Sequence, residues 1–302
     1  MKKFSFIIIA LAAVFIAVNY AADYVIYRPL KEVAPMPENF KETVIAKTSG
    51  ETLYAALSPA KPGKETIIFF HGNAGNISYY IQFAEIYSAQ GFGVFMFDFG
   101  GFGKSEGGLN QESFFEDAKA ALDYLITKEN IPPQKLILFA HSLGNTALLE
   151  TALAYNGLPF KALIMQSPFT NTPDMAASFL MRGGYRHNSV FRKTASALAY
   201  PFLFNKLFNN IDKIRDLKNP VFIIYSRQDM LIPWEMSDAL FKAAPAGSRN
   251  FISPHGGHNN FEWSEKAVSD YLESLPKAEA SSAQTPLKTE HKSGAGFSLG
   301  RE

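Results

Sequence analysis

The sequence predicts an α/β protein with a mostly parallel central sheet that carries helices on both faces. Short runs of β-branched and aromatic residues, typical of buried strands, alternate along the chain with longer helix-forming segments. Such alternation is typical of parallel sheets whose connecting helices cover both faces. Residues 23–276 form one block, which is long enough for a single large domain with a sizeable core.

Each expected element has its own signal. The strands are runs rich in Val, Ile, Leu and Phe, and they end in glycine or polar residues. The helices are longer segments between these runs, and the last of them is amphipathic. After two early strands we expect strand 66–70, helix 78–89, strand 93–97, helix 111–128, strand 135–139, helix 143–155, strand 162–165, an insertion, strand 221–225, helix 235–244, strand 250–252 and helix 261–275.

A serine stands at the turn between the strand at 135–139 and the helix that follows. The segment Ala140-His141-Ser142-Leu143-Gly144 has small residues two positions before and two positions after the serine, as a sharp strand-to-helix turn requires. Such a turn exposes the hydroxyl and sets it beside backbone N–H groups. Ser142 is therefore the predicted nucleophile, although the five-residue match alone also fits a helix N-cap serine.

An acid and a histidine follow later strand ends. Asp229 lies in a loop just after strand 221–225, and His258 lies in a glycine-rich loop before the last helix. We favour Asp229 as the acid over Asp174, which follows the preceding strand. His255, three residues before His258, is the competing base.

The loop after strand 66–70 is expected to complete an oxyanion site. It has the sequence His71-Gly72-Asn73-Ala74-Gly75-Asn76, and the backbone N–H of Asn73 is one predicted donor. The other is the N–H of Leu143, the residue that follows the nucleophile. His141, on the other side of the nucleophile, is either a substrate-binding residue or a residue that fills space.

From about residue 23 to residue 275 the chain resembles the α/β-hydrolase superfamily and, within it, the Bem46-type membrane-anchored serine hydrolases. The chain order of serine, acid and histidine also matches that superfamily. The Gly-His-Asn match favours His258 over His255. The resemblance implies the α/β-hydrolase fold and acyl-enzyme chemistry. The matching residues are His71 to Asn76, Asp98 with its glycine turn, Ser142 to Gly144, Asp229 with Pro233, and Gly257 to Asn259.

Two residues depart from the family pattern. Ala140 replaces the first glycine of the nucleophile turn, and alanine is small enough for that turn. Gly100 stands where such proteins often carry an arginine after Asp98, which leaves open how the turn is braced. His71 and Asp98 are expected to brace loops at the sheet edge through hydrogen bonds.

The N-terminal residues predict a membrane-targeting segment. Lys2 and Lys3 precede an apolar run over 4–22, whose helix would rise roughly 28 Å, close to the about 30 Å of a hydrocarbon core. The nearest A-x-A match lies inside the run, so we expect an uncleaved anchor over 1–22. The N-terminus would be cytoplasmic and the catalytic domain would lie on the non-cytoplasmic side, periplasmic in a bacterium. Secretion after signal-peptide cleavage is the alternative.

Two further segments differ from the core in composition. Residues 170–217 contain an insertion with apolar pieces, expected to form a helical lid in which Phe202 and Phe204 contact substrate. Ordinary core packing of these aromatic residues is the alternative. Residues 277–302 are rich in Ala, Ser, Gly, Lys and Glu, and are expected to be a disordered tail.

The predicted function is hydrolysis of ester or thioester bonds through a Ser-His-Asp acyl-enzyme, with acylated or lipid-derived substrates favoured by the anchor and lid. A peptidase or amidase of the same fold, or a non-catalytic membrane-tethered binding module, is the alternative. No metal is expected, because cysteine is absent and the six histidines lack metal-binding spacing. The acyl-enzyme mechanism needs no cofactor, and none is expected. Lysine and arginine total 29 against 28 acidic residues, which argues against a nucleic-acid partner.

Overall fold

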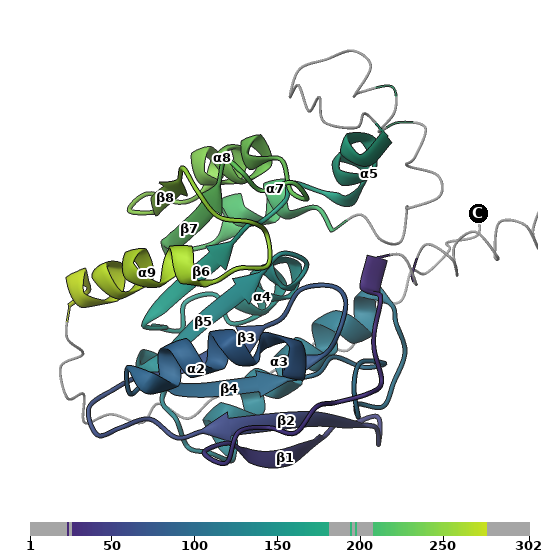
Figure 1. Cartoon of the computed structure of the whole chain (residues 1–302), viewed down its shortest axis with the longest axis vertical. Helices are drawn as coiled ribbons and strands as arrows, with labels where there is room; N and C mark the ends of the chain where they lie inside the picture. Colours follow the sequence, from purple (N-terminus) through teal and green to yellow (C-terminus); the bar gives the residue numbers. More distant parts are fainter. Residues whose placement is uncertain (1–22, 24–25, 181–193, 195–196, 198–207, 277–302) are drawn as a thin grey trace, which may run out of the picture.

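The computed structural model describes residues 23, 26–180, 194, 197 and 208–276. Within these residues, eight strands form one sheet in the order β1-β2-β4-β3-β5-β6-β7-β8 (Figure 1). The first two strands pair antiparallel with their neighbours, and all later pairs are parallel, so the predicted mostly parallel sheet is confirmed. The strands are β1 (Lys41–Ala46), β2 (Thr52–Ser58), β3 (Thr66–Phe70), β4 (Gly93–Phe97), β5 (Leu136–His141), β6 (Ala162–Gln166), β7 (Val221–Ser226) and β8 (Arg249–Ser253).

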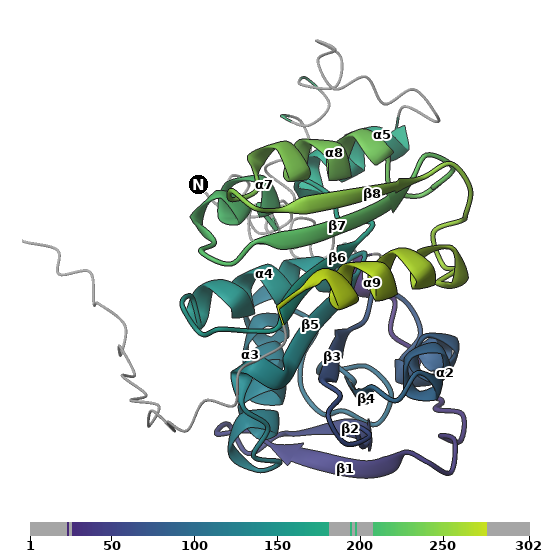
Figure 2. The ribbon, with the colours of Figure 1, turned by 90° about the vertical axis from the view of Figure 1, so that its left-hand side faces the viewer.

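Helices cover both faces of the sheet, as predicted (Figures 1 and 2). Helices α2 and α9 pack on one face, and α3, α4 and α8 pack on the other. The helices are α2 (Ile81–Ala89), α3 (Gln111–Thr127), α4 (Gly144–Ala154), α5 (Thr172–Leu180), α7 (Asn210–Lys213), α8 (Trp234–Ala243) and α9 (Glu262–Ser274), with 3₁₀ turns η1 (Ile77–Tyr80), η2 (Pro133–Lys135) and η3 (Ile214–Asp216).

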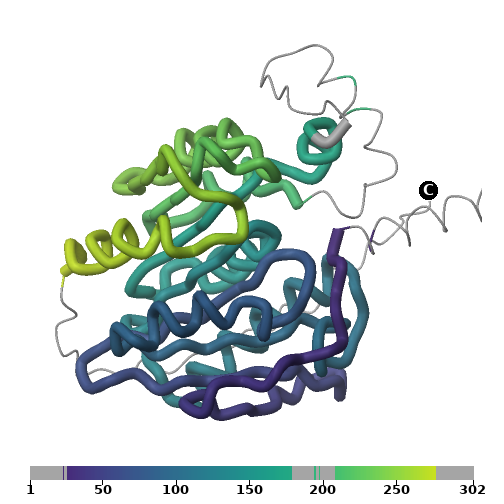
Figure 3. The backbone as a smooth tube through the Cα atoms, in the orientation of Figure 1, coloured from purple at the N-terminus to yellow at the C-terminus, as the bar shows by residue number. Residues whose placement is uncertain are grey.

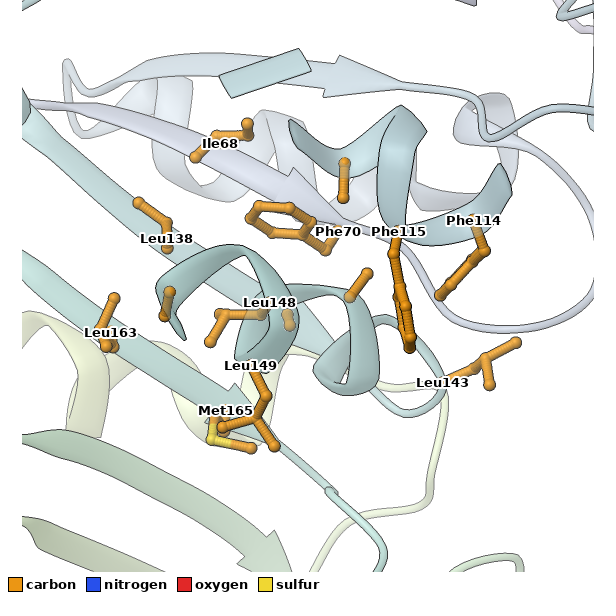
Figure 4. Packing of buried hydrophobic residues seen from close by; sticks show 14 of the residues in the cluster. Ile68, Phe70, Phe114, Phe115, Leu138, Leu143, Leu148, Leu149, Leu163 and Met165 are labelled. Carbon is orange, nitrogen blue, oxygen red and sulfur yellow. The ribbon is translucent and has the colours of Figure 1, made fainter. Parts of the chain in front are cut away.

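The central strands are uninterrupted apolar runs because both of their faces are covered. In β3, Ile67 and Phe69 pack against α2 and α9, while Ile68 and Phe70 pack into the cluster on the opposite face. Figure 4 shows this second cluster, in which Leu148 of α4 lies beside the sheet residues. Every residue of β3 is buried, which is the pattern expected of a strand inside a parallel sheet. Each such large apolar side chain contributes about 1.5–3 kcal/mol to the stability of the fold.

The turn after Asp98 is braced by a buried ion pair rather than by an arginine. The Gly100 N–H donates to Oδ2 of Asp117 at 2.6 Å, and Oδ1 of Asp117 accepts from Lys47 Nζ at 2.6 Å. A Cβ on residue 100 would lie 2.9 Å from that same Asp117 oxygen. Glycine therefore fits this turn because the carboxylate of α3 approaches its backbone closely.

Three predictions concern residues outside the described ones. They are the anchor at 1–22, the tail at 277–302 and the substrate contacts of Phe202 and Phe204 in the proposed lid. Within the described chain, the helices are all too short or too polar to cross a bilayer. The insertion does contribute α5 at its start and α7 at its end.

Candidate active site

Ser142 lies on the sharp turn between β5 and α4. Its backbone is left-handed, with a φ of 52°, a strained conformation for a residue other than glycine. A Cβ on Gly144 would lie 2.1 Å from the Phe70 carbonyl oxygen, so only glycine permits this approach of α4 to the end of β3. The N-cap position of α4 belongs to Leu143, and the serine side chain has another partner.

That partner is His258. Nε2 of His258 lies 2.9 Å from Ser142 Oγ, and Nδ1 lies 2.7 Å from Oδ2 of Asp229. The three residues come from the loops after β5, β7 and β8, which end at the same edge of the parallel sheet. The fold thus brings His258 to a serine 116 residues before it and to an acid 29 residues before it.

The Asp229 carboxylate is held in its charged form. Burial alone would raise its pKa, but hydrogen bonds from His258 and from the Leu231 and Ile232 amides lower the pKa below its usual value. Both amides donate to Oδ1 at 2.9 Å, which leaves Oδ2 for the histidine. With Asp229 ionised, the Nδ1 position of His258 carries the proton, and Nε2 is free to accept from the serine hydroxyl.

The two competing residues lie elsewhere. Asp174 is in the first turn of α5, where Thr170 and Asn171 donate to its carboxylate at 3.3 and 3.1 Å. His255 is exposed, and its N–H donates to Ser253 Oγ. The geometry favours Asp229 over Asp174 and His258 over His255.

Asn145 stabilises the serine turn and has no counterpart in the sequence prediction. Its side-chain amide donates to the Ser142 and Gln166 carbonyl oxygens, each at 2.8 Å, and the Ser142 N–H donates to that same Gln166 oxygen at 2.9 Å. A polar residue in the fully buried first turn of α4 is the signal that could have identified it.

The loop after β3 runs directly beside the serine. A Cβ on Gly72 would lie 3.2 Å from Ser142 Cβ, and Tyr80 donates its hydroxyl to the Asn73 carbonyl oxygen at 3.3 Å. Within the described part of the chain, neither the Asn73 N–H nor the Leu143 N–H has a hydrogen-bond acceptor. The Leu143 side chain is buried and belongs to the apolar cluster shown in Figure 4.

His141 is buried beside the catalytic candidates. Its ring centre is 4.7 Å from that of His258 and 5.0 Å from that of Phe261. Burial and then the neighbouring His258 lower the pKa of His141 well below its usual value, so it remains neutral. A neutral neighbour does not repel a proton on His258. The role of His141 in substrate binding stays a prediction.

Comparison with known proteins bears on the family of the chain. A sequence model described as Hydrolase_4, serine aminopeptidase, S33, matches residues 61–199. Protein YfhR of Escherichia coli K12 is 26% identical over 265 residues, covering 85% of this chain and 87% of its own. Protein bem46 of Schizosaccharomyces pombe is 26% identical over 240 residues, covering 76% of each chain. The chain belongs to the α/β-hydrolase superfamily.

A solved structure supports the same fold. The Pyrococcus furiosus esterase Pf2001 superposes with a TM-score of 0.61 at 18% identity, covering 82% of this chain and 98% of its own. The resemblance seen in the sequence is confirmed at the level of the superfamily, and the chain is an enzyme of the α/β-hydrolase type.

A second buried pair, His71 and Asp98, lies at the loop after β3. His71 Nδ1 donates to the Gly72 carbonyl oxygen at 2.8 Å, and Oδ1 of Asp98 accepts from the Ile77 N–H at 2.7 Å. The two side chains are 3.7 Å apart, between Nε2 and Oδ1. Burial lowers the pKa of His71 to about 4 and raises the pKa of Asp98 to about 7.

The shift at Asp98 predicts a pH-dependent stability. Because burial raises its pKa in the folded state, the protonated carboxyl stabilises the fold at low pH, and this contribution is lost as the pH rises to about 7. Asp98→Asn removes the titration but keeps the oxygen that accepts from Ile77. From about pH 5 to about pH 8, the wild type should lose about 3 kcal/mol of unfolding free energy relative to this variant.

Denaturant unfolding of both proteins at the two pH values measures this difference. Asp270→Asn, which removes an exposed surface carboxylate, is the matched control. A wild type that gains stability relative to Asp98→Asn as the pH rises would contradict the assignment.

Proposed function

We propose that the chain is a serine hydrolase of esters and thioesters, with Ser142 as nucleophile, His258 as base and Asp229 as acid. The observation that carries this proposal is the unbroken hydrogen-bond chain from the Asp229 carboxylate through both His258 nitrogens to the Ser142 hydroxyl. A non-catalytic binding module would not need a serine, a histidine and an acid in this hydrogen-bonded order.

In the proposed reaction, Ser142 Oγ attacks the carbonyl carbon while Nε2 of His258 takes the hydroxyl proton. The histidine then gives that proton to the leaving alkoxide or thiolate as the C–O or C–S bond breaks, which leaves an acyl-serine. Water attacks the acyl-serine and passes a proton to His258, and Ser142 recovers the proton as the carboxylic acid leaves. Ionised Asp229 stabilises the imidazolium and fixes its tautomer.

The negative charge that develops on the carbonyl oxygen also needs donors. The N–H groups of Asn73 and Leu143 flank the serine turn and have no other acceptor in the described chain, so they are the proposed oxyanion donors. Removing one such donor from a serine hydrolase typically costs about 10²- to 10³-fold in kcat.

Two substrate classes have support. The solved neighbour from Pyrococcus furiosus is named an esterase, which favours esters. A serine peptidase or amidase is the second candidate, because the matching family model is described as a serine aminopeptidase. The catalytic residues alone do not choose between these leaving groups.

We further propose that residues 1–22 tether a hydrolase domain, residues 23–276, to the non-cytoplasmic side of a membrane, with 277–302 as a tail. Release by signal-peptide cleavage is the alternative. A tether would keep the site beside acylated or lipid-derived substrates. Phe202 and Phe204 in the insertion are the proposed contacts to their acyl chains.

One substrate panel tests this function on the full-length chain in detergent. We expect kcat/KM for esters to rise several-fold per pair of carbons from acetate toward palmitate, since each buried methylene contributes about 0.8 kcal/mol. Replacing both Phe202 and Phe204 with serine should flatten this rise without changing acetate hydrolysis. Val44→Ser, an exposed apolar position on the edge strand β1, is the control.

The panel includes an aminoacyl anilide, and Ser142→Ala sets the background rate. Anilide hydrolysis faster than that of every ester would favour the peptidase. Ester rates that fall beyond butyrate in the wild type would contradict an acyl groove and favour small soluble esters.

A further inference from the structure

The segment just before β1 crosses the loop that carries Asn73. We call residues 27–34 the N-terminal strap; it is the purple tube that descends along one edge of the fold in Figure 3. The Ala74 N–H donates to the Tyr27 carbonyl oxygen at 2.8 Å, and the Leu30 N–H donates to the Gly75 carbonyl oxygen at 2.9 Å. The strap therefore binds both residues that follow Asn73.

Asn76 provides a second connection between this loop and the strap. Its side-chain amide donates to the Leu30 and Glu32 carbonyl oxygens at 3.1 and 2.7 Å. Its Oδ1 accepts from the backbone N–H and the hydroxyl of Ser78, at 3.0 and 2.6 Å. Asn76 is fully buried, so all of its hydrogen-bonding capacity is used to join the strap to the start of η1.

Tyr27 fixes the strap to the core. It is fully buried, and its ring centre lies 5.6 Å from that of Phe114 and 6.3 Å from that of Phe208. The Leu30 carbonyl oxygen also accepts from the Gly103 N–H at 2.9 Å. The strap is thus attached on one side to the core and on the other to the Asn73 loop.

The Asn73 loop needs such a support because its backbone is unfavourable. Ala74 and Gly75 are both left-handed, with φ of 65° and 75°, and this conformation costs a residue such as alanine roughly 1–2 kcal/mol. The hydrogen bonds of the strap fall on these two residues. On the other side of Asn73, Gly72 lies against Ser142. The strap therefore fixes the backbone on one side of Asn73, and packing against Ser142 fixes it on the other side. Together they determine the direction in which the Asn73 N–H points.

We infer that the N-terminal strap positions the oxyanion hole, with Tyr27 and Asn76 as positioning residues that act through the Asn73 amide. The inference rests on the proposed function, since it assigns the strap a role in the same reaction. It makes a stretch of residues close to the N-terminus necessary for transition-state stabilisation, although Ser142, His258 and Asp229 all lie outside this stretch.

The test uses the full-length chain and two variants, Asn76→Asp and Tyr27→Ala. Asn76→Asp keeps the oxygen that accepts from Ser78 but replaces the donor to the strap with an acceptor. Tyr27→Ala removes the ring that holds the strap to the core. Tyr27→Phe, which keeps the ring, should restore activity, and Leu30→Ala, which trims an exposed side chain and keeps the backbone, is the control.

For each protein, kcat and KM are measured on an acetyl ester, with active sites titrated to completion by a fluorophosphonate. We expect kcat per titrated site to fall about 10- to 100-fold in the two variants, with KM within about twofold, and the inhibition constant of a boronic acid to rise in parallel. Tyr27→Phe and Leu30→Ala should match the wild type.

A strap with a purely structural role would lower the melting temperature or the number of titrated sites and leave kcat per site unchanged. That result, with an active wild type, would overturn the inference alone. A wild type that hydrolyses no ester would contradict the proposed function and, with it, this inference.

Discussion

Replacing His258 with alanine should lower kcat for ester hydrolysis by about 10⁴- to 10⁶-fold with little change in KM. The Nε2 atom of His258 is the group within hydrogen-bond distance of the Ser142 hydroxyl, so without it the serine has no base and the leaving group has no acid. Steady-state kinetics on an acetyl ester measure the effect. His255→Ala, in the same loop, is the matched control and should keep the wild-type rate.

An effect of His258→Ala smaller than about tenfold would mean that the histidine does not transfer the proton in the slow step. A severe loss in His255→Ala, with folding intact, would place the base three residues earlier than the geometry does.

Asp229→Asn should lower kcat by about 10³- to 10⁴-fold, because asparagine cannot hold His258 in the tautomer that accepts from serine. The variant keeps the oxygen that accepts from the Leu231 and Ile232 amides, so the loop and the melting temperature should change little. The kinetics are compared with those of Asp174→Asn, which changes a carboxylate in α5.

If Asp174→Asn were the crippling change and Asp229→Asn mild, the acid would be wrongly assigned. The conservative change to asparagine matters here, because alanine at position 229 would also leave two amides without an acceptor and confuse catalysis with folding.

Most of the fold can be predicted from the sequence because the central strands are buried on both faces. Strands of this kind are continuous apolar runs, so their ends can be recognised in the sequence. For example, β5 begins one residue after the predicted start. The start of α2 is less accurate, because the segment at 78–80 forms the 3₁₀ turn η1 rather than α-helix. The sequence pattern at a helix start is too weak a signal to distinguish a 3₁₀ turn from the first turn of an α-helix.

The proposed nucleophile and its proposed partners follow strand ends, and parallel strands end at one edge of the sheet. For this reason the sequence predicts that Ser142, Asp229 and the loop with His258 lie together. The preference for His258 over His255 comes from the family resemblance. The contacts that support them cannot be grouped in this way. Asn145 reaches the Gln166 carbonyl, and the strap at 27–34 reaches the Asn73 loop, through long-range contacts that no local pattern specifies.

The bracing of the glycine turn is a further example. Gly100 departs from the family pattern, and the sequence offers no replacement for the missing arginine. The replacement is the Asp117 carboxylate, which is held by Lys47, the residue directly after β1. Lys47 and Asp117 are far apart in sequence, so their ion pair becomes evident only when α3 and the edge strands are placed together.

We propose that Ser142 is the one activated hydroxyl of this enzyme, and covalent labelling tests this role. The full-length chain is treated with a fluorophosphonate, and the modified residue is located by peptide mass spectrometry, with Ser142→Ala in parallel. We expect a single adduct on Ser142 and no adduct in the variant, whose melting temperature should match that of the wild type. Labelling that persists in Ser142→Ala, or no labelling of the folded wild type, would contradict it.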